Sequence, residues 1–442
     1  MTTLPQLAQA MQTLLTTDAE QAAQQSGVIQ RVRQFTGPSL AQTLVFGWLA
    51  NPRATLGDLA ASAACCGVTV SPEGLHQRFT PTAAQFLERL LARALRHVVE
   101  ADPVAVPLLR RFAEVDIRDS TVVTLPDSLA AYWPGCGGST GRGGSAGLKF
   151  QVRLSLCTGR LRALTPQAAR LCDQAASAQE DDLPPGSLRL ADLGYFQLNA
   201  FQRWHRQGGY FLSRLLPSTK VYDAAGQELH LARWLARQQG KHLDVAIQLG
   251  AQQRLPCRLL VERVPAAVVR KRRARIRNDA LRRGRKASAA TLELAAWTLY
   301  VTNVPADQLS VVEALALGRA RWQIELLFKL WKEHGLLDEW RSDQPWRIVC
   351  EIFAKLVGLV IQHWVLLVSQ WQHVDRSMRK AAPKLRQHVW HLASVLHSVV
   401  QVVAVLRLMQ RCLAVACRIH KSRKTPRTGD ILKEPSLSHS LT

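Results

Sequence analysis

The sequence predicts a mixed α/β fold in which a strand-rich middle region lies between helical regions at both ends of the chain. Apolar residues recur at helical spacing through the first 110 residues, alternate as in strands from Phe112 onward, and return to helical spacing near the C-terminus. At 442 residues, of which 47% are hydrophobic, the chain is long and apolar enough to form two or three domains.

Residues 1–110 are expected to form a helical N-terminal region. A helix from Thr55, a turn at Gly67 and a second helix capped by Ser71, with Pro72 at its first position, resemble a helix-turn-helix with a long turn. An ordinary helical hairpin is the alternative, because this region is nearly neutral. The sequence therefore leaves DNA contact by this segment open.

The middle region, residues 111–345, predicts one catalytic domain. Its strands and helices alternate in a defined order: strands 115–119 and 122–125, a glycine-rich connection 135–144, a hairpin 148–156 and 161–165, a helix 166–178, a strand 187–192, a helix 198–206 and a strand 209–214. Three antiparallel strands, a helix, and then strands alternating with helices are the order of a ribonuclease-H-like mixed sheet. The glycine-rich connection lacks the Gly-Lys-Ser/Thr of a phosphate loop, so we expect a flexible link there.

Residues 216–296 are expected to be a β-rich basic insertion in this domain, with strands at 243–249 and 258–264. A strand at 297–303 and a long helix from near Ala306 resume the domain. Residues 346–417 predict a C-terminal helical region, and 418–442 a basic flexible tail.

The charge balance indicates a polyanionic partner. The chain has 57 Lys and Arg against 33 Asp and Glu, a formal net charge of +24, and residues 270–286 alone hold ten Lys and Arg against one acid. Such a run favours phosphate binding over a solvated helix face. Its first four basic residues, Arg270, Lys271, Arg272 and Arg273, are candidate DNA contacts. A ribosome-like structural role and a membrane-surface role are the alternatives.

Cysteine usage and hydropathy indicate a cytoplasmic protein without a membrane partner. None of the nine cysteines is spaced as Cys-x-x-Cys, so we expect reduced thiols, mostly in the core. The N-terminus lacks the pattern of a signal peptide. Residues 356–374 and 391–406 approach membrane length, but Gln and His interrupt them, which favours buried helices of a soluble bundle.

Two aspartates are the first candidates for chemistry. Asp119 ends the first strand and Asp192 ends the fourth; in the expected sheet these strands are neighbours, so the two carboxylates converge. Close carboxylates repel unless they share protons or hold a cation, and near phosphate the natural cation is Mg²⁺. Asp116, on the same strand, is the fallback for Asp119.

A helix around residues 318–332 carries the third acid. On a helix that turns about 100° per residue, Arg321, Glu325 and Lys332 fall within about 40° of one another. A surface salt-bridge ladder has the same Arg–Glu spacing. The surrounding segment is apolar, however, where an unpaired carboxylate is costly, and this favours a functional Glu325.

These motifs together resemble the bacterial insertion-sequence transposases of the DDE class, in the group with the signature Tyr-x2-Arg-x3-Glu-x6-Lys. Arg321, Glu325 and Lys332 match at the right intervals, while Gly318 stands where the group has tyrosine. The Asp-Ser-Thr setting of Asp119 and the Asp-x-Gly-Tyr-Phe setting of Asp192 match the first two acids. The resemblance covers about residues 110 to 345.

The resemblance implies that Asp119, Asp192 and Glu325 hold two Mg²⁺ ions, with Mn²⁺ able to substitute, for DNA cleavage and strand transfer. It also implies that Arg321 and Lys332 contact phosphates near the cleaved end. The partners would be the terminal inverted repeats and target DNA, with excision through a DNA hairpin by a homodimer that associates with the nucleoid. With Gly318 in place of tyrosine one end contact of the group is missing, and Gly318→Tyr is expected to raise activity if this copy has decayed at that position.

Two other functions remain open from sequence. One is a nuclease that cuts structured DNA without strand transfer. The other is a non-catalytic DNA-binding protein derived from a transposase, although retention of all three acids argues against it. The repeat sequence, the target preference and the choice between cis and trans cleavage are not encoded in any motif of the chain.

Overall fold

The computed structural model describes residues 2–31, 33–137, 145–173, 183–373, 376–419 and 428–435. The fold is mixed α/β, as expected, with nine strands in a mostly antiparallel sheet of order β3-β2-β1-β4-β5-β9-β8-β7-β6. The chain divides into two compact units: unit 1 comprises 1–104, 120–171 and 325–421, and unit 2 comprises 105–119, 172–324 and 422–442. Strand β1 (Val115–Leu125) contributes to both units.

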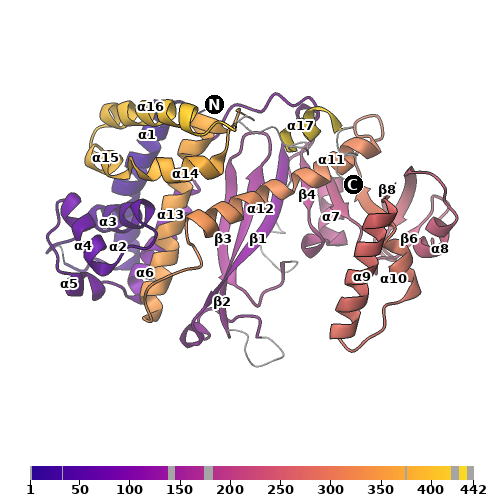
Figure 1. Cartoon of the computed structure of the whole chain (residues 1–442), viewed down its shortest axis with the longest axis horizontal. Helices are drawn as coiled ribbons and strands as arrows, with labels where there is room; N and C mark the ends of the chain where they lie inside the picture. The colour runs from indigo at the N-terminus through magenta and orange to yellow at the C-terminus, as the bar shows by residue number, and fades with distance from the viewer. Residues whose placement is uncertain are drawn as a thin grey trace. The chain divides into compact units, whose positions relative to one another are not determined.

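Unit 1 is a helical assembly with a β-hairpin. Its elements are α1 (Leu4–Thr13), α2 (Ala19–Ser26), α3 (Gly37–Ala50), α4 (Leu56–Cys65), α5 (Pro72–His76), α6 (Pro81–Ala94), β2 (Ala146–Ser155), β3 (Leu161–Ala168), α13 (Pro345–Gln370), α14 (Met378–Arg386), α15 (Val389–Ser394) and α16 (Val399–Ala416). Within the described residues, α13 packs against α3 and α6 (Figure 1). The N-terminal and C-terminal helices therefore share one core.

Threonine and serine side chains begin the N-terminal helices, and the cap predicted from sequence, Ser71, is among them. Thr3, Thr36 and Thr55 each accept a hydrogen bond from the backbone three residues later. Ser71 caps α5 in the same way, and Gly67 takes a φ of +77° in the turn that precedes it. The helix–turn–helix segment is thus formed as expected, although its geometry alone assigns it no function.

Helix α13 is the buried helix expected from the longer apolar segment. Its most apolar 18-residue window is 94% buried. The second expected segment, 391–406, is divided between α15 and α16, and the most apolar window of α16 is only 33% buried, so this segment is not one buried helix. Both α13 and α16 are long and apolar enough to cross a membrane by composition. His363 in α13 lies 2.8 Å through Nε2 from the Gly159 carbonyl at the β2–β3 turn. Burial lowers the pKa of His363 to about 4, so it is neutral at pH 7.

Unit 2 is built on a sheet with two chemically different faces. Its elements are the first part of β1, β4 (Leu188–Ala191), α7 (Leu198–Arg206), β5 (Tyr210–Arg214), β6 (Val221–Tyr222), α8 (Leu231–Ala236), β7 (His242–Leu249), β8 (Leu255–Arg263), α9 (Ala266–Arg282), α10 (Ala289–Leu294), β9 (Trp297–Thr302), α11 (Val311–Ala320) and α17 (Thr428–Lys433). Phe211, Leu299 and Val301 belong to an aromatic-rich core together with Phe201 and Trp204 of α7. The insertion strands β6, β7 and β8 extend this same sheet.

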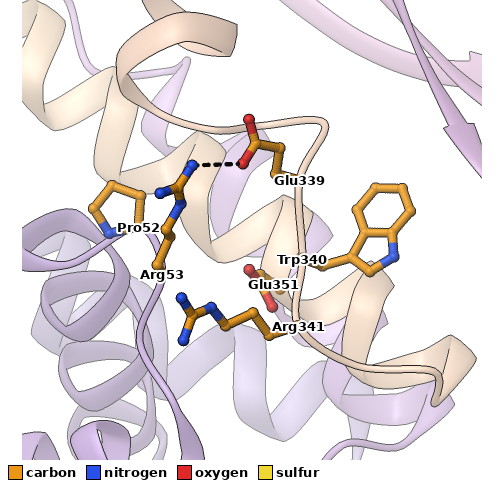
Figure 2. A pocket seen from close by; sticks show the side chains of 6 residues that line it. All are labelled: Pro52, Arg53, Glu339, Trp340, Arg341 and Glu351. Atoms are coloured by element: carbon orange, nitrogen blue, oxygen red, sulfur yellow. Dashed lines mark hydrogen bonds and ion pairs between the residues drawn. The ribbon is translucent and has the colours of Figure 1, made fainter.

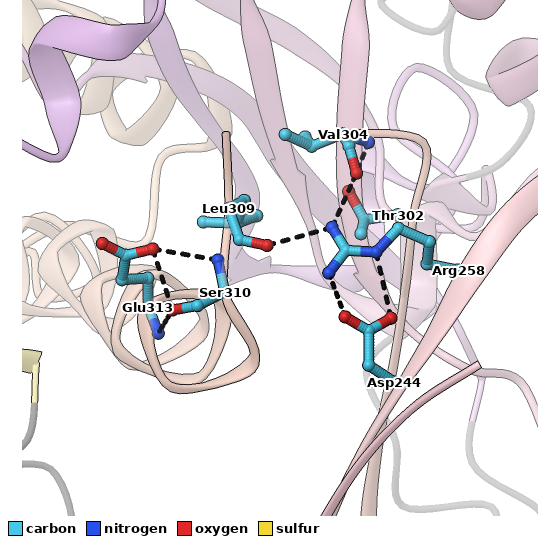
Figure 3. A network of polar contacts seen from close by, with 7 residues as sticks. All are labelled: Asp244, Arg258, Thr302, Val304, Leu309, Ser310 and Glu313. Atoms are coloured by element: carbon cyan, nitrogen blue, oxygen red, sulfur yellow. Dashed lines mark hydrogen bonds and ion pairs between the residues drawn. The ribbon is translucent and has the colours of Figure 1, made fainter. Parts of the chain in front are cut away.

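A polar network fixes the start of α11 (Figure 3). The Arg258 guanidinium on β8 pairs with Asp244 and donates to the carbonyls of Val304 and Leu309 at 2.8 and 2.9 Å. Ser310 and Glu313 then form a capping box at the first turn of the helix. Helix α11 is therefore anchored to the insertion strands β7 and β8.

Three expected elements differ in the structure. Pro166 does not begin a helix; it lies in β3 opposite Phe150, and β3 is an edge strand, where a missing backbone N–H is tolerated. Residues 174–178 of that expected helix, and 138–144 of the glycine-rich link, lie outside the described residues. The long helix starts at Val311 rather than Ala306, because Ser310 supplies the cap.

The third difference is in the expected flexible tail, of which residues 420–427 and 436–442 lie outside the described residues. Residues 428–433 form α17, which packs against α11 and buries Ile431 and Leu432. No disulfide joins the nine cysteines, all of which lie in the described ranges, and only Cys257, Cys350 and Cys417 are buried, so the expectation that the cysteines are mostly core residues is wrong.

Glu313 predicts a pH-dependent contribution to stability. Burial raises the pKa of Glu313, but hydrogen bonds from Arg111 and Ser310 outweigh it and hold the pKa below the ordinary value of 4.5. A lowered folded-state pKa stabilises the fold above the unfolded value, and this contribution is lost as pH falls through the folded-state pKa. Glu313→Gln is therefore expected to lower the free energy of unfolding by about 1 kcal/mol at neutral pH and by less near pH ~3. Urea unfolding at both pH values measures this, and an equal loss at both would contradict it.

Candidate active site

Strand register brings Asp119 and Asp192 to one level of the sheet. Strands β1 and β4 are parallel neighbours, with Ile117 beside Leu190 and Arg118 beside Ala191. Extending this register by one residue places Asp119 beside Asp192, and paired residues of neighbouring strands point to the same face. Asp192 keeps extended backbone angles, so the alternation holds at its position.

A single guanidinium joins the two carboxylates. Arg321 Nη1 donates to Asp119 Oδ2 at 2.8 Å, and its Nε lies 3.7 Å from Asp192 Oδ1. The side chains of Arg321 and Asp119 are each 20% exposed, and that of Asp192 is 37% exposed. The predicted convergence of the two aspartates is therefore present, with positive charge between them.

Asp116 faces the opposite side of the sheet and has a structural role. It is three residues from Asp119, so strand alternation turns it to the other face. There it lies beside Arg189 of β4, with 3.7 Å between the charged groups, and the Arg189 guanidinium lies 4.8 Å above the Trp204 ring. Both side chains are almost fully buried. The fallback role for Asp116 is therefore wrong, because its carboxylate points into the core.

The continuous helix expected through the signature is divided in the structure. Arg321 lies between α11 and α12 (Trp322–Lys329), and Lys332 lies in a π-helix, Leu330–His334. The structure brings Asp119 and Asp192 together within unit 2, whereas Glu325 begins the 325–421 segment of unit 1. Lys332 Nζ donates to the Val122 carbonyl at 2.9 Å and lies 3.6 Å from Asp338. Lys332 thus contacts β1 itself.

Gly318 is required by its surroundings. A Cβ at position 318 would lie 2.8 Å from Tyr300 Cε1, and closer still to the ring carbon and hydroxyl beyond it. A tyrosine at position 318 would clash with Tyr300, because the two side chains would occupy the same space, so the structure gives no support to a gain of activity from Gly318→Tyr in a chain that retains Tyr300. Sequence reasoning missed Tyr300; the alternation of β9 was the available signal.

The basic run forms α9, and its residues divide into two groups. Arg272 donates to the Trp297 carbonyl and to Thr298 Oγ1 at 3.0 and 3.1 Å, and Arg273 donates to the Leu292 carbonyl at 2.9 Å. These two arginines fasten α9 to α10 and β9, whereas Arg270 and Lys271 are exposed. Arg275 is also exposed, at 87%, although it lies 4.0 Å from Asp279.

A small polar pocket lies in unit 1, in the segment that follows the signature (Figure 2). Its volume is about 170 Å³, and Arg53, Glu339, Arg341 and Glu351 contribute to its wall. Figure 2 shows Arg53 directed at Glu339, 3.1 Å away, while the Trp340 ring points aside. Glu351 forms a buried pair with Lys355, which donates to the Glu339 carbonyl at 2.8 Å. The charges of this pocket thus stabilise the loop after the signature helix.

The donor chemistry at the aspartate pair fits a hard divalent cation. Its atoms are carboxylate oxygens only, which Mg²⁺ and Mn²⁺ prefer. Across the described ranges, no group of three or more His, Cys, Asp or Glu residues is arranged to hold a metal ion. The pair therefore offers two ligands and requires a further group to complete a metal site.

Comparison with known families agrees with this geometry. The transposase DDE domain matches residues 111–361, more than half of the chain. The chain therefore belongs to the family of transposases with a DDE domain.

The relatives are transposases of insertion sequences. The transposase of element IS231F from Bacillus thuringiensis subsp. israelensis is 26% identical over 415 residues, which cover 88% of this chain and 86% of the relative. That of IS231B from Bacillus thuringiensis subsp. berliner is 25% identical over 410 residues, covering 86% and 84%. Among solved structures, a piggyBac transposase synaptic complex with hairpin DNA aligns with a TM-score of 0.46 and 7% identity, over 95% of this chain and 87% of that one.

Asp116 and Asp119 are expected to differ in their effect on stability. Asp116→Asn removes a carboxylate charge from beside the buried Arg189 guanidinium and should lower the free energy of unfolding by about 3 kcal/mol. Asp119→Asn removes repulsion with Asp192 as well as one Arg321 contact, so its cost should stay under about 1 kcal/mol. Chemical denaturation of both variants measures the difference, and equal losses would contradict the two-face assignment.

Proposed function

We propose that this chain is a cut-and-paste transposase that binds the terminal inverted repeats of its element, cleaves them and joins them to target DNA. The observation that carries the proposal is the pair Asp119 and Asp192, level on one face of the sheet and bridged by Arg321. A DNA-binding protein without catalysis gains nothing from two carboxylates facing phosphate, so the pair favours phosphoryl-transfer chemistry. The order β3-β2-β1-β4-β5 supports a ribonuclease-H-like core for this domain.

Glu325 is assigned as the third ligand because it follows Arg321 by one helical turn in the Tyr-Arg-Glu-Lys pattern. Asp119, Asp192 and Glu325 would hold two Mg²⁺ or Mn²⁺ ions, which supply activation of the attacking oxygen and stabilisation of the leaving oxygen. Arg321 neutralises part of the charge of the aspartate pair and, in this proposal, also contacts a phosphate of the bound end. Lys332 donates to the Val122 carbonyl of β1 and, in this proposal, also contacts a phosphate near the cleaved end.

The exposed residues of α9 are proposed as a phosphate-binding surface. Arg270, Lys271 and Arg275 are exposed, and they belong to the basic run of α9, a helix that buries none of its residues. Neutralising DNA phosphates with such residues releases counterions, so this binding depends on salt. Arg272 and Arg273 contribute by holding the helix in position.

The remaining parts of the proposal follow from family resemblance. A homodimer would pair the two element ends, and excision would pass through a DNA hairpin, in the bacterial cytoplasm at the nucleoid. A structure-specific nuclease is the second candidate, because cleavage and strand transfer use the same carboxylates. A magnesium-dependent strand-transfer assay on the inverted repeats that flank the gene distinguishes the two functions, since a nuclease would cleave without joining.

Removal of one acid is expected to abolish chemistry and preserve binding. Asp119→Asn, Asp192→Asn and Glu325→Gln each remove negative charge where divalent ions would bind, so nicking and joining should fall by at least about 10³-fold with end binding retained. Glu333→Gln is the matched control, because Glu333 forms an exposed ion pair with Arg379 and its removal should leave activity near normal. Gel-based cleavage and mobility-shift assays measure both. Near-normal strand transfer by Glu325→Gln would remove it from the site.

The two groups of α9 residues should separate in a salt titration. Replacing Arg270 and Lys271 by Ala should weaken DNA binding and reduce the log–log salt slope by about 0.9 for each phosphate that is no longer neutralised, with unchanged stability. Replacing Arg272 and Arg273 by Ala removes their hydrogen bonds to Trp297 and Leu292 and should lower the melting temperature instead. An unchanged slope in the first variant would show that these residues are a solvated face.

A further inference from the structure

Strand register forms a row of polar residues that extends beyond the two aspartates. Ala191 of β4 pairs with Ser213 of β5, so the next level places Asp192 beside Arg214. Arg214 pairs in turn with Tyr300 of β9. Asp119, Asp192, Arg214 and Tyr300 therefore follow one another across four neighbouring strands, on the same face.

Tyr300 faces away from the core that its neighbours on β9 line. Trp297, Leu299 and Val301 of β9 are buried in the aromatic-rich core, and Tyr300 alternates to the other face. Its ring lies on Gly318 of α11, which has no side chain to exclude it. Gly318 precedes Arg321 by three residues, so the residue that the ring contacts lies about one helical turn before Arg321, whose charge acts on Tyr300.

The electrostatic surroundings make Tyr300 a hydrogen-bond donor. Burial raises the pKa of Tyr300, and Asp192 raises it further, against the opposing effects of Arg214, Arg321 and Arg319. The phenol is therefore neutral at pH 7 and keeps its proton. A neutral O–H among several cations is suited to donate to an anionic oxygen that those cations attract.

We propose that Tyr300 is a substrate-positioning residue whose hydroxyl donates to a phosphate oxygen of the bound DNA end. It takes the place of the tyrosine that the signature carries at position 318, so that the phenol comes from β9 and the glycine makes room for it. This inference rests on the proposed function, because it assigns a DNA contact to the same site. Gly318 is then a complement to Tyr300 rather than a sign of a decayed element.

The test compares single and exchanged variants in binding and in cleavage. Tyr300→Phe keeps the ring on Gly318 and removes the hydroxyl, and it should weaken binding of a fluorescent inverted-repeat duplex in EDTA by roughly tenfold. Gly318→Ala should do the same by displacing the ring. The exchange Gly318→Tyr with Tyr300→Gly returns a phenol to the same space and should restore binding to within about threefold of the unmodified chain.

Tyr222→Phe is the matched control, because Tyr222 lies on β6 beside Arg254 and far along the sheet order from β1. It should bind and cleave as the unmodified chain does. The melting temperature of each variant shows whether it folds. If Tyr300→Phe or Gly318→Ala does not fold, the exchange variant is compared with the unmodified chain in its place.

The outcomes are distinct. The role of Tyr300 is overturned if Tyr300→Phe binds and cleaves like the unmodified chain. It is also overturned if a folded exchange variant binds the duplex as weakly as Gly318→Ala. An unmodified chain that binds the repeat but shows no magnesium-dependent cleavage overturns the proposed function instead. Weakened binding in Tyr300→Phe with an unchanged melting temperature, together with rescue by the exchange, supports the inference.

Discussion

Two carboxylates that lie side by side, one within β1 and one directly after β4, must be matched by positive charge, and several contacts of unit 2 meet this requirement. The β1–β4 register sets Asp119 and Asp192 at the same level, where their repulsion would be large without a cation. Arg321 supplies that charge from the junction of two helices. The position of α11 therefore depends on the aspartates as much as on its own packing.

The network at the start of α11 sets where that guanidinium can lie. Arg258 connects β8 to the loop before the helix, and the capping box at Ser310 defines its first turn. Arg111, in the segment that leads into β1, donates to Glu313 at 2.7 Å. The insertion strands and the segment that leads into β1 thus hold the same helix, so the insertion has a structural purpose besides its positive charge.

Much of the fold follows from patterns that lie close together in the sequence. The alternation around Asp119 and Asp192, the glycine turn at 159 and the helix 198–206 were all predictable, because strand and helix periods and turn residues act over a few positions. The convergence of the two aspartates was predictable to the same extent, although β1 continues past Asp119 to Leu125 and only Asp192 directly follows the end of its strand. The failures arose where a partner distant in sequence decided the outcome, as for Pro166, which pairs with β2, and for α17, which packs on α11.

The sequence alone determined the order of strands and helices, the positive charge, and the spacing of the acids and of the Arg-Glu-Lys motif, since these depend on residue type and local periodicity. Only the tertiary structure decided which groups meet. Asp116 and Asp119 are equivalent as residues, yet the strand register turns one to Arg189 and the other to Arg321. Likewise, the motif alone does not explain why position 318 is glycine. The reason is Tyr300, 18 positions earlier (318 − 300), whose ring occupies the space beside Gly318 only after the sheet and the helix have packed.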